Sequence, residues 1–408
     1  MRQKFPRPRE INISKAVERE LSRPEIAAFI QPGKKVALAV GSRGLNGLTE
    51  IVQNVVRILK SQNCEPFIVP AMASHGGATA EGQEAILASY GITKENVGAP
   101  VYSSMEVTEL GQISSEMPVY FDRLALSADL IIPINRVKPH TSFHGPIESG
   151  LLKMLCIGLG KHIGATVFHH RGMENFVSLL PEAGQLILAK APVAFGLATI
   201  ENAFGELALL RAVPKSRMIE EEIELLKKAR TLMGQILFKR IDLLIVDEIG
   251  KDISGEGMDP NVTRRFSSPL ISVPDEPCRI VVLDLTAKTK GNAIGLGLAD
   301  ITTERVWLKI DLQATYTNTI TTTYLNLAKI PLMASSDQEA IQIALSSIPG
   351  CCLPEEARVV RIKNTKDLEE IFISQALKNE ALENPAIEVL SEALDPEFDK
   401  NGNFLSGI

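Results

Sequence analysis

The chain has 408 residues, 45% of them apolar and 23% charged, which is typical of a globular protein large enough for two domains. Its 43 basic and 49 acidic residues form no basic block, which argues against a nucleic-acid or anionic-membrane surface. Without a run of about 18 apolar residues or an apolar amino-terminal core, we expect neither a membrane span nor a secretory signal. The five scattered cysteines favour reduced thiols in a cytoplasmic protein over a disulfide framework or a structural zinc site.

In chain order, the first half alternates short apolar runs with amphipathic segments. The predicted strands lie at 34–42, 64–72, 127–137 and 191–201, and the predicted helices lie at 48–63 and 81–91. Such alternation predicts a parallel α/β sheet. In these sheets ligands bind beyond the carboxyl ends of the strands.

The second half begins a new unit of the same kind. A long amphipathic helix over 216–237 leads into predicted strands at 241–250 and 277–286. The tail from about 366 is predicted to be helical and charged before it turns polar in DPEFDKNGNFLSGI (395–408). We therefore predict two α/β domains, 1–237 and 238–408, with the active site in the cleft between them.

The first predicted strand runs into a glycine-rich turn, GSRGLNG, with Arg43 inside it. Free amides at the start of the following helix, beside a guanidinium, make a good anion site, although a plain turn is an equally good interpretation. The GxxGxxG spacing and the absence of an acidic residue after the second strand argue against a dinucleotide fingerprint.

All six histidines fall between residues 75 and 170, most of them near predicted strand ends. They are His75, His140, His144, His162, His169 and His170. Imidazole serves both proton transfer and metal ligation, so this confinement favours a functional site. No HExxH or HxH zinc pattern and no GxSxG nucleophile elbow is present. Lys161 and His162 are interpreted as surface residues.

Taken in order, Arg43, His75, the segment KPHTSFHGPIESGLLK (138–153) and VFHH (167–170) resemble a family of isomerases that use a nickel-pincer cofactor. Lactate racemase is the founding activity of that family. The resemblance covers residues 36–175, and it is specific as an ordered set, because each piece alone is a weak signal.

The resemblance implies a covalently bound cofactor, a pyridinium-3-thioamide-5-thiocarboxylic acid mononucleotide that holds nickel through one carbon and two sulfurs. Lys153 in SGLLK would tether it through its thioamide, and His169 would complete the nickel site. The further residues expected to contact the cofactor are Ser42, Arg43, Ser149 and Gly150. Cofactor-building enzymes are then the expected partners upstream.

The implied reaction is racemisation or epimerisation of a 2-hydroxy acid by abstraction and return of a hydride. The hydroxyl proton needs a base on each side of the substrate, and His75 and His140 are the candidates. Arg43 would bind the substrate carboxylate or a neighbouring cofactor group.

Three departures from the family pattern leave alternatives open. The loop before the lysine motif is three residues longer than in the racemases and contains His144, which competes with His140 as the second base; His140 is favoured because it keeps the Pro–His pairing. His170 competes with His169 for nickel in the same way. The helix that carries a substrate-binding Gln and Lys in racemases is not recognisable here, so another 2-hydroxy acid or a sugar acid is an alternative substrate.

Two glycine-rich segments of the second half, 250–265 and 286–303, are candidates for a substrate wall. The predicted contacts are Lys288, Lys290, Asn292 and Asp300. Two other functions are considered: a binding or regulatory protein that kept the fold and lost the chemistry, and a metal-dependent hydrolase.

Overall fold

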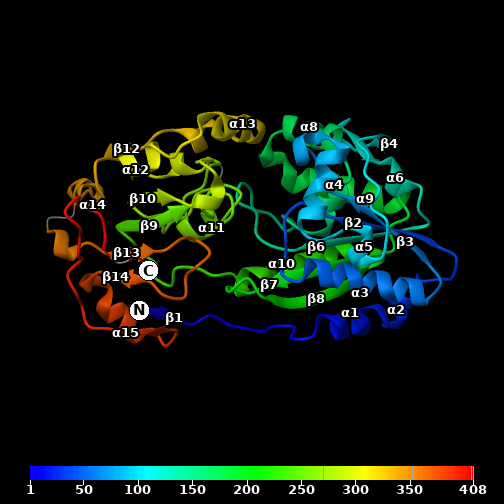
Figure 1. The fold of residues 1–408 in the computed structure, drawn as a ribbon, viewed down its shortest axis with the longest axis horizontal. Coiled ribbons are helices and arrows are strands. Elements are labelled where there is room, and N and C mark those ends of the chain that lie inside the picture. The colour runs from blue at the N-terminus through cyan, green and yellow to red at the C-terminus, as the bar shows by residue number, and fades with distance from the viewer. Residues whose placement is uncertain (270, 351–352, 406, 408) are drawn as a thin grey trace. The chain divides into compact units, whose positions relative to one another are not determined.

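The computed structural model describes residues 1–408 apart from 270, 351–352, 406 and 408. The chain divides into two compact units (Figure 1). The N-terminal unit is Arg7–Met233, and the C-terminal unit is Gly234–Ile408 together with Met1–Pro6. Each unit has its own α/β sheet, as the alternation of apolar runs predicted. A site between the two units stays a prediction.

The sheet of the N-terminal unit has the strand order β3-β2-β6-β7-β8. Its strands are β2 (Lys35–Val40), β3 (Glu65–Pro70), β6 (Leu130–Arg136), β7 (Phe195–Glu201) and β8 (Leu207–Pro214). The first four are parallel, as predicted, and β8 adds an antiparallel edge that the sequence did not indicate. A separate hairpin is formed by β4 (Val107–Gln112) and β5 (Pro118–Asp122).

Helices connect these strands. They are α1 (Ile13–Leu21), α2 (Pro24–Ala27), α3 (Leu48–Ser61), α4 (Ala80–Ser89), α5 (Lys94–Val97), α6 (Arg123–Leu126), α7 (Leu151–Lys153), α8 (Lys161–His170), α9 (Phe176–Lys190) and α10 (Met218–Leu232), with short 3₁₀ or π turns at η1 (Gly76–Ala78), η2 (Met154–Gly158), η3 (Met173–Asn175) and η4 (Lys215–Arg217). The apolar stripe predicted for α3 is buried against the sheet through Ile51, Val55 and Leu59. Burial of one apolar face is what stabilises an amphipathic helix in a protein.

The C-terminal unit contains a second sheet of order β12-β11-β10-β9-β13-β14. Its strands are β9 (Leu243–Ile249), β10 (Arg279–Leu285), β11 (Ile301–Thr303), β12 (Leu332–Ala334), β13 (Val359–Ile362) and β14 (Phe372–Ile373). Its helices are α11 (Pro260–Thr263), α12 (Glu304–Trp307), α13 (Leu312–Thr322), α14 (Asp337–Ser346) and α15 (Lys378–Glu383), with 3₁₀ turns η5 (Ala287–Thr289), η6 (Leu296–Leu298), η7 (Leu325–Ala328), η8 (Pro354–Glu356) and η9 (Gln375–Leu377). All strands are parallel except β14.

The unit boundaries differ from the predicted ones at both ends. The boundary between the two units lies between Met233 and Gly234 rather than between residues 237 and 238. Helix α10 ends at Leu232, earlier than its sequence pattern suggested. The first six residues belong to the C-terminal unit, since β1 (Arg2–Gln3) pairs antiparallel with β15 (Ile387–Glu388). This pairing joins residues that are 384 or more positions apart, so no local sequence pattern could have predicted it.

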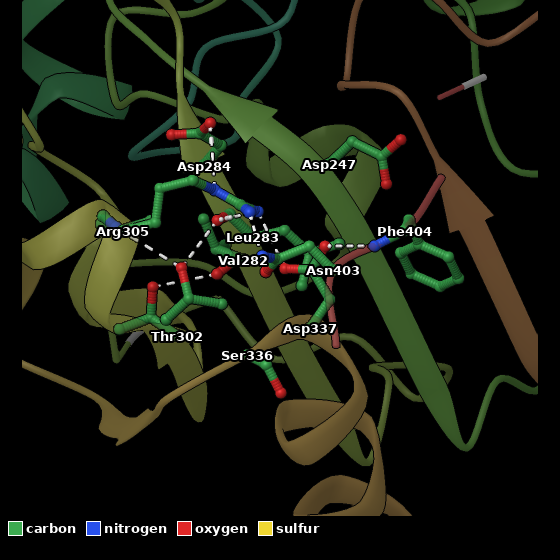
Figure 2. A network of polar contacts seen from close by, with 12 residues as sticks. Asp247, Val282, Leu283, Asp284, Thr302, Arg305, Ser336, Asp337, Asn403 and Phe404 are labelled. Atoms are coloured by element: carbon green, nitrogen blue, oxygen red, sulfur yellow. Dashed lines mark hydrogen bonds and ion pairs between the residues drawn. The ribbon is translucent and has the colours of Figure 1, made fainter. Parts of the chain in front are cut away.

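The tail after residue 366 is mostly irregular, and α15 is its only α-helix among the described residues, so the prediction of a helical tail is wrong for most of it. Polar contacts bind the segment around Asn403 and Phe404 to the rest of the C-terminal unit, as Figure 2 shows. Arg305 lies 2.8 Å from Asp337 and donates to the Asn403 side chain at 3.0 Å, while the Phe404 amide donates to Asp337 at 3.0 Å. Tertiary contacts of this kind hold a segment without regular structure.

Among the described residues, no single helix is long and apolar enough to cross a membrane. One pair of helices, Leu151–Gly158 and Lys161–His170, meets the length and composition test only jointly and is bent by 103°.

Candidate active site

Three loops that carry predicted site residues meet at the carboxyl edge of the N-terminal sheet. Ser42 and Arg43 follow β2, His75 follows β3, and His140 follows β6. Because β2 lies between β3 and β6, the strand order reverses here, and parallel sheets commonly bind ligands at such a point. The topology thus gathers residues that are far apart in the sequence.

His75 is held by neighbours on both sides. Its Nδ1 is in hydrogen-bond contact with Ser42 Oγ, and the Tyr90 hydroxyl donates to the Ser42 carbonyl. The Gln83 amide donates to the carbonyl oxygens of Ala73 at 2.8 Å and His75 at 3.3 Å. Tyr90 and Gln83, which the sequence analysis did not single out, therefore fix the loop that presents this imidazole.

Lys161 is completely buried, so the expectation of a surface position is wrong for it, whereas His162 is exposed as expected. The Lys161 ammonium donates to the Pro70 carbonyl at 2.6 Å and to the Gln83 side-chain oxygen at 3.1 Å. It lies 2.9 Å from an Asp122 carboxylate oxygen. Burial lowers the pKa of Lys161, and the Asp122 charge opposes that effect. β3 ends at Pro70, so Lys161 and its ion pair with Asp122 hold the start of the loop that carries His75.

Replacing Lys161 by methionine is expected to lower the free energy of unfolding by about 3–5 kcal/mol, because it leaves the buried Asp122 carboxylate without its cation. Urea denaturation measures the change. The double variant Lys161→Met with Asp122→Asn should recover much of the loss, since both charges are then absent. A loss no larger than that of the exposed control Lys227→Met would contradict the structural role.

The glycine-rich turn differs from the predicted anion site. The Asn46 amide at the start of α3 donates to the Glu201 carboxylate at 2.9 Å, and Glu201 is itself paired with Arg136. Gly47 follows with a φ of 75°, a conformation that favours glycine. A carboxylate from the chain thus lies in the turn just before the N-cap of α3, and its negative charge opposes the binding of an anion there.

The segment that follows β6 is a loop closed at its base. The Lys138 amide donates to the Ser149 carbonyl at 2.9 Å, and the Ser149 amide donates back at 3.3 Å. Inside the loop, the buried Glu148 carboxylate accepts the His140 amide at 2.6 Å and the Gly145 amide at 2.9 Å. One carboxylate therefore organises the loop that carries both competing histidines.

His144 lies on the outside of this loop. It is exposed, and its Nδ1 is 3.2 Å from Glu148, which also pairs with Arg230. Burial raises the pKa of Glu148, but the hydrogen bonds from His144 and from the loop amides outweigh burial, so the net pKa is lowered. Glu148 is accordingly a carboxylate at neutral pH, and His144 contributes to closing the loop.

His140 lies on the inside, among the other site residues. Burial, followed by the positive charges of Lys153, Lys138 and Arg43, holds the pKa of His140 well below its ordinary value. Its ring packs on Phe143 with 4.4 Å between ring centres. The imidazole is therefore neutral at physiological pH and close to three cations.

Two phenylalanines connect His140 with the other predicted ligands. Phe143 lies 5.4 Å from Phe176, and Phe176 lies 5.5 Å from His169, between ring centres. The Lys153 ammonium is 5.8 Å from the centre of the Phe143 ring. The structure thus brings His140, Lys153 and His169 around one aromatic pair.

Lys153 is presented by α7, and the backbone before it is tightly held. The Asn135 amide donates to the Gly150 carbonyl at 2.6 Å, and the Leu152 amide donates to Glu222 at 3.0 Å. A side chain at Gly150 would place its Cβ 2.5 Å from a Glu222 oxygen. A side chain at this position of SGLLK would therefore displace the Glu222 carboxyl group from its contact with the Leu152 amide.

Glu222 is a buried carboxyl whose pKa is raised to about 7 by burial, although the amides of Leu152 and Leu151 act in the opposite direction. An acid with a raised pKa holds its proton in the folded chain and releases it in the unfolded chain. We therefore expect stability to fall as the pH rises from about 4.5 to about 7, by about 3 kcal/mol in total. Glu222→Gln should abolish this dependence and be the more stable form above pH 7 in urea denaturation.

The matched control is Glu224→Gln, an exposed glutamate on the same helix. It should leave the pH dependence unchanged. A Glu222→Gln profile that follows the wild-type profile would show that Glu222 ionises normally.

His169 and His170 sit in different environments. His169 is partly buried and its Nδ1 donates to the Ala165 carbonyl at 2.6 Å, which leaves the lone pair on Nε2, whereas His170 is exposed. Burial lowers the pKa of His169, partly offset by that hydrogen bond. A backbone carbonyl on one ring nitrogen is the usual second contact of a metal-binding histidine. Among the described residues, no group of three or more His, Cys, Asp or Glu side chains could hold a metal ion.

Of the contacts predicted in the C-terminal unit, Lys288 and Lys290 are exposed just beyond the carboxyl end of β10. Asn292 is buried. It accepts the Ile294 amide of its own loop at 3.2 Å and donates to the Ala314 carbonyl of α13 at 3.4 Å. Its polar groups are therefore used to shape the backbone.

Asp300 lies at the opposite edge of the same sheet. It precedes β11, pairs with Arg265 at 2.6 Å and accepts the Ile280 amide at 2.7 Å at the start of β10. Because ligands bind at the carboxyl edge, the prediction of a substrate contact for Asp300 is withdrawn.

Two acidic residues that organise the site, Glu148 and Glu222, were missed by the sequence analysis. Glu148 had a weak signal, since it lies four residues after His144 and next to the SGLLK motif. Glu222 occupies the apolar stripe of α10 with Met218 and Leu225, where a charged residue is unusual. The run EEEIELLKK (220–228), in which it lies, has the charge pattern of a solvated helix face and gave no sign of a buried carboxyl group.

Residues 3–175 match the family model described as the lactate racemase N-terminal domain. No curated protein matches the chain. The lactate racemase apoprotein from Thermoanaerobacterium thermosaccharolyticum is similar in structure, with a TM-score of 0.52 and 12% identity over 88% of this chain and 93% of that chain. A structural-genomics protein from Thermotoga maritima has a TM-score of 0.50 and 14% identity over 88% of this chain and 97% of its own. At these identities the two structures establish the fold.

Proposed function

Because residues 3–175 match the family model of the lactate racemase N-terminal domain, we propose that this protein is a racemase or epimerase of a 2-hydroxy acid or sugar acid. The cofactor proposed for it is a nickel-pincer nucleotide bound covalently to Lys153, which cofactor-building enzymes would supply. The observation that carries the proposal is the assembly of His140, Lys153 and His169 around Phe143 and Phe176 at the carboxyl edge of the sheet.

The residues present fit this cofactor. Lys153 follows Gly150 and Leu152, whose backbone groups are hydrogen-bonded to the side chains of Asn135 and Glu222. The Lys153 side chain therefore extends from a fixed position. His169 has its proton on Nδ1 and its lone pair on Nε2, the form that ligates a metal. When bound, the cofactor would supply a nickel-supported carbon that accepts a hydride and gives it back.

The chain itself would bind the acid and handle the hydroxyl proton. Arg43 and Lys138 place positive charge near His140, which suits a carboxylate substrate. His75 and His140 are the proposed pair at the substrate hydroxyl. Loss of the proton from the hydroxyl oxygen and of the hydride from C2 would give a 2-oxo acid. Return of the hydride to the other face of C2, and of a proton to the oxygen, would invert the centre. His144 takes no part, since it is bonded to Glu148 on the outer side of the loop.

The test is co-expression with the cofactor-building enzymes. The purified protein should contain nickel and carry a mass addition. It should also invert the configuration at C2 of its substrate while retaining the C2 hydrogen, screened over a panel of 2-hydroxy acids and sugar acids labelled with deuterium at C2. Nickel and adduct without any inversion at C2 would favour the rival function, a binding or regulatory protein with the same fold. Neither nickel nor adduct would overturn the proposal.

A further inference from the structure

Helix α13 of the C-terminal unit has its polar side buried and its apolar side exposed. Among its described side chains, the buried ones are Thr315 and Thr319. Leu312, Tyr316 and Ile320 follow one another at spacings of four residues, and all three are exposed. A surface helix ordinarily buries its apolar stripe and exposes its polar face. The apolar stripe of α13 therefore faces away from its own unit.

Hydrogen bonds fix α13 in this orientation. The Ala293 amide donates to the Thr315 hydroxyl at 3.0 Å, and that hydroxyl donates to the Asp311 carbonyl at 2.7 Å. The Thr319 hydroxyl donates to the Thr315 carbonyl at 2.8 Å. Turning the helix so that its apolar stripe faced inward would break the bond between Ala293 and Thr315. The exposure of the stripe is thus built into the fold of the unit.

The stripe belongs to a larger apolar surface. Nine large apolar side chains between Trp307 and Met333 are each 38–83% exposed, out of nineteen such exposed side chains among the described residues. Ile330, two residues before β12, lines the same small hollow as Leu312 and Tyr316. Figure 1 shows α12, α13 and β12 along one border of the C-terminal unit. We call the nine exposed side chains the α13 face.

The α13 face is larger than the apolar patches of ordinary monomers. Its side chains are exposed by about half on average, which corresponds to roughly 800 Å² when a whole large side chain presents about 150–250 Å². The largest apolar patch on a typical monomer is about 300–600 Å². One partner of a stable protein interface contributes about 800 Å². The area thus matches one half of a dimer interface.

The composition of the face suits a second copy of the same chain. Lys329 is the only charged residue of segment 312–333, although 23% of the whole chain is charged. A two-fold axis brings identical residues together, so a face that binds its own copy has to lack like charges at its centre. Strand β12 ends the strand order of its sheet, with β11 as its one described neighbour. Such an edge strand can pair antiparallel with the same strand of another copy.

We propose that the α13 face is the interface of a homodimer, in which α13 and β12 of one chain meet the same elements of a second copy across a two-fold axis. The two copies together bury about 1,600 Å², the size of a standard specific interface. The inference is independent of the proposed activity, because it uses no residue of the candidate active site.

The mass of the full chain in solution tests the dimer. Light scattering and sedimentation over a dilution series should give twice the mass of one chain, falling to a single chain on dilution. Ile320→Glu and Tyr316→Glu each bring two like charges together at the interface, so each should raise the Kd at least about 100-fold. Circular dichroism should show an unchanged fold, since both side chains are exposed.

Leu382→Glu is the matched control, because Leu382 is exposed to a similar extent on α15 of the same unit. It should leave the Kd unchanged. A monomeric wild-type chain, or equal Kd values in Ile320→Glu and Leu382→Glu, would overturn the inference.

Hydrogen exchange of the backbone amides locates the interface without any substitution. Amides of 312–333 should exchange at least about tenfold more slowly in the concentrated dimer than in the diluted monomer, whereas those of α15 should be equal in both. Slower exchange confined to another segment would place the interface elsewhere and contradict the inference. Protection of 312–333 that is independent of dilution would mean that another part of the chain covers the face, which also contradicts it.

Discussion

Replacing Lys153 by alanine is expected to abolish the mass addition and, with it, all inversion of the substrate at C2. No other residue can take over the attachment, because α7 and the backbone bonds to Gly150 and Leu152 place the Lys153 ammonium beside Phe143 and His140. Intact-protein mass spectrometry after co-expression with the cofactor-building enzymes measures the adduct. Nickel content should fall in parallel, since a cofactor without its tether is washed out during purification.

Two variants control this result. Lys153→Arg keeps the positive charge but has no primary amine to form the bond, so it should also lack the adduct. Lys227→Ala removes an exposed lysine of α10 and should keep the full adduct. An unchanged mass addition in Lys153→Ala would mean that another side chain is the anchor.

Replacing His169 by alanine is expected to lower bound nickel by at least about tenfold while leaving the covalent adduct in place. The reason is that the two ring nitrogens have different roles. Nδ1 donates to the Ala165 carbonyl, so Nε2 is the nitrogen that would bind nickel. Elemental analysis gives nickel per chain, and mass spectrometry on the same sample gives the adduct. Loss of nickel with retention of the adduct separates a ligand from an anchor.

His170→Ala is the matched control, since His170 is the next residue on α8 but is exposed. It should keep nickel close to the wild-type level. Nickel lost from His170→Ala and retained in His169→Ala would reverse the assignment and would require α8 to turn within the folded protein.

The core of the N-terminal unit was accessible from local patterns. Continuous apolar runs bounded by glycine and proline predicted β2, β3, β6 and β7, because a strand buried on both faces has to be apolar along its whole length. The short strands β11, β12 and β14 were missed, since runs of two or three residues carry no period. Edge strands and the β1–β15 pairing depend on partners far away in the sequence.

The candidate site was predictable in part for the same reason. Residues that follow parallel strands share one edge, so Arg43, His75 and His140 could be grouped before any contact was known. The anchor lysine and the nickel ligand came from a resemblance of ordered motifs. Asp300 failed because it precedes its strand, which places it at the amino edge.

By itself, the sequence determined the alternation of strands and helices and the edge at which the histidines gather, because both follow from local hydrophobic period and chain order. The candidate lysine came from the resemblance of its motif. Only the tertiary structure decided between neighbours that look alike in sequence: His140 faces Lys153 and Phe143, whereas His144 faces Glu148 on the outside. It also decided that Lys161 and Glu222 are buried. Burial and hydrogen-bond partners depend on side chains tens of residues away, and these set both the pKa of a group and the nitrogen that carries its proton.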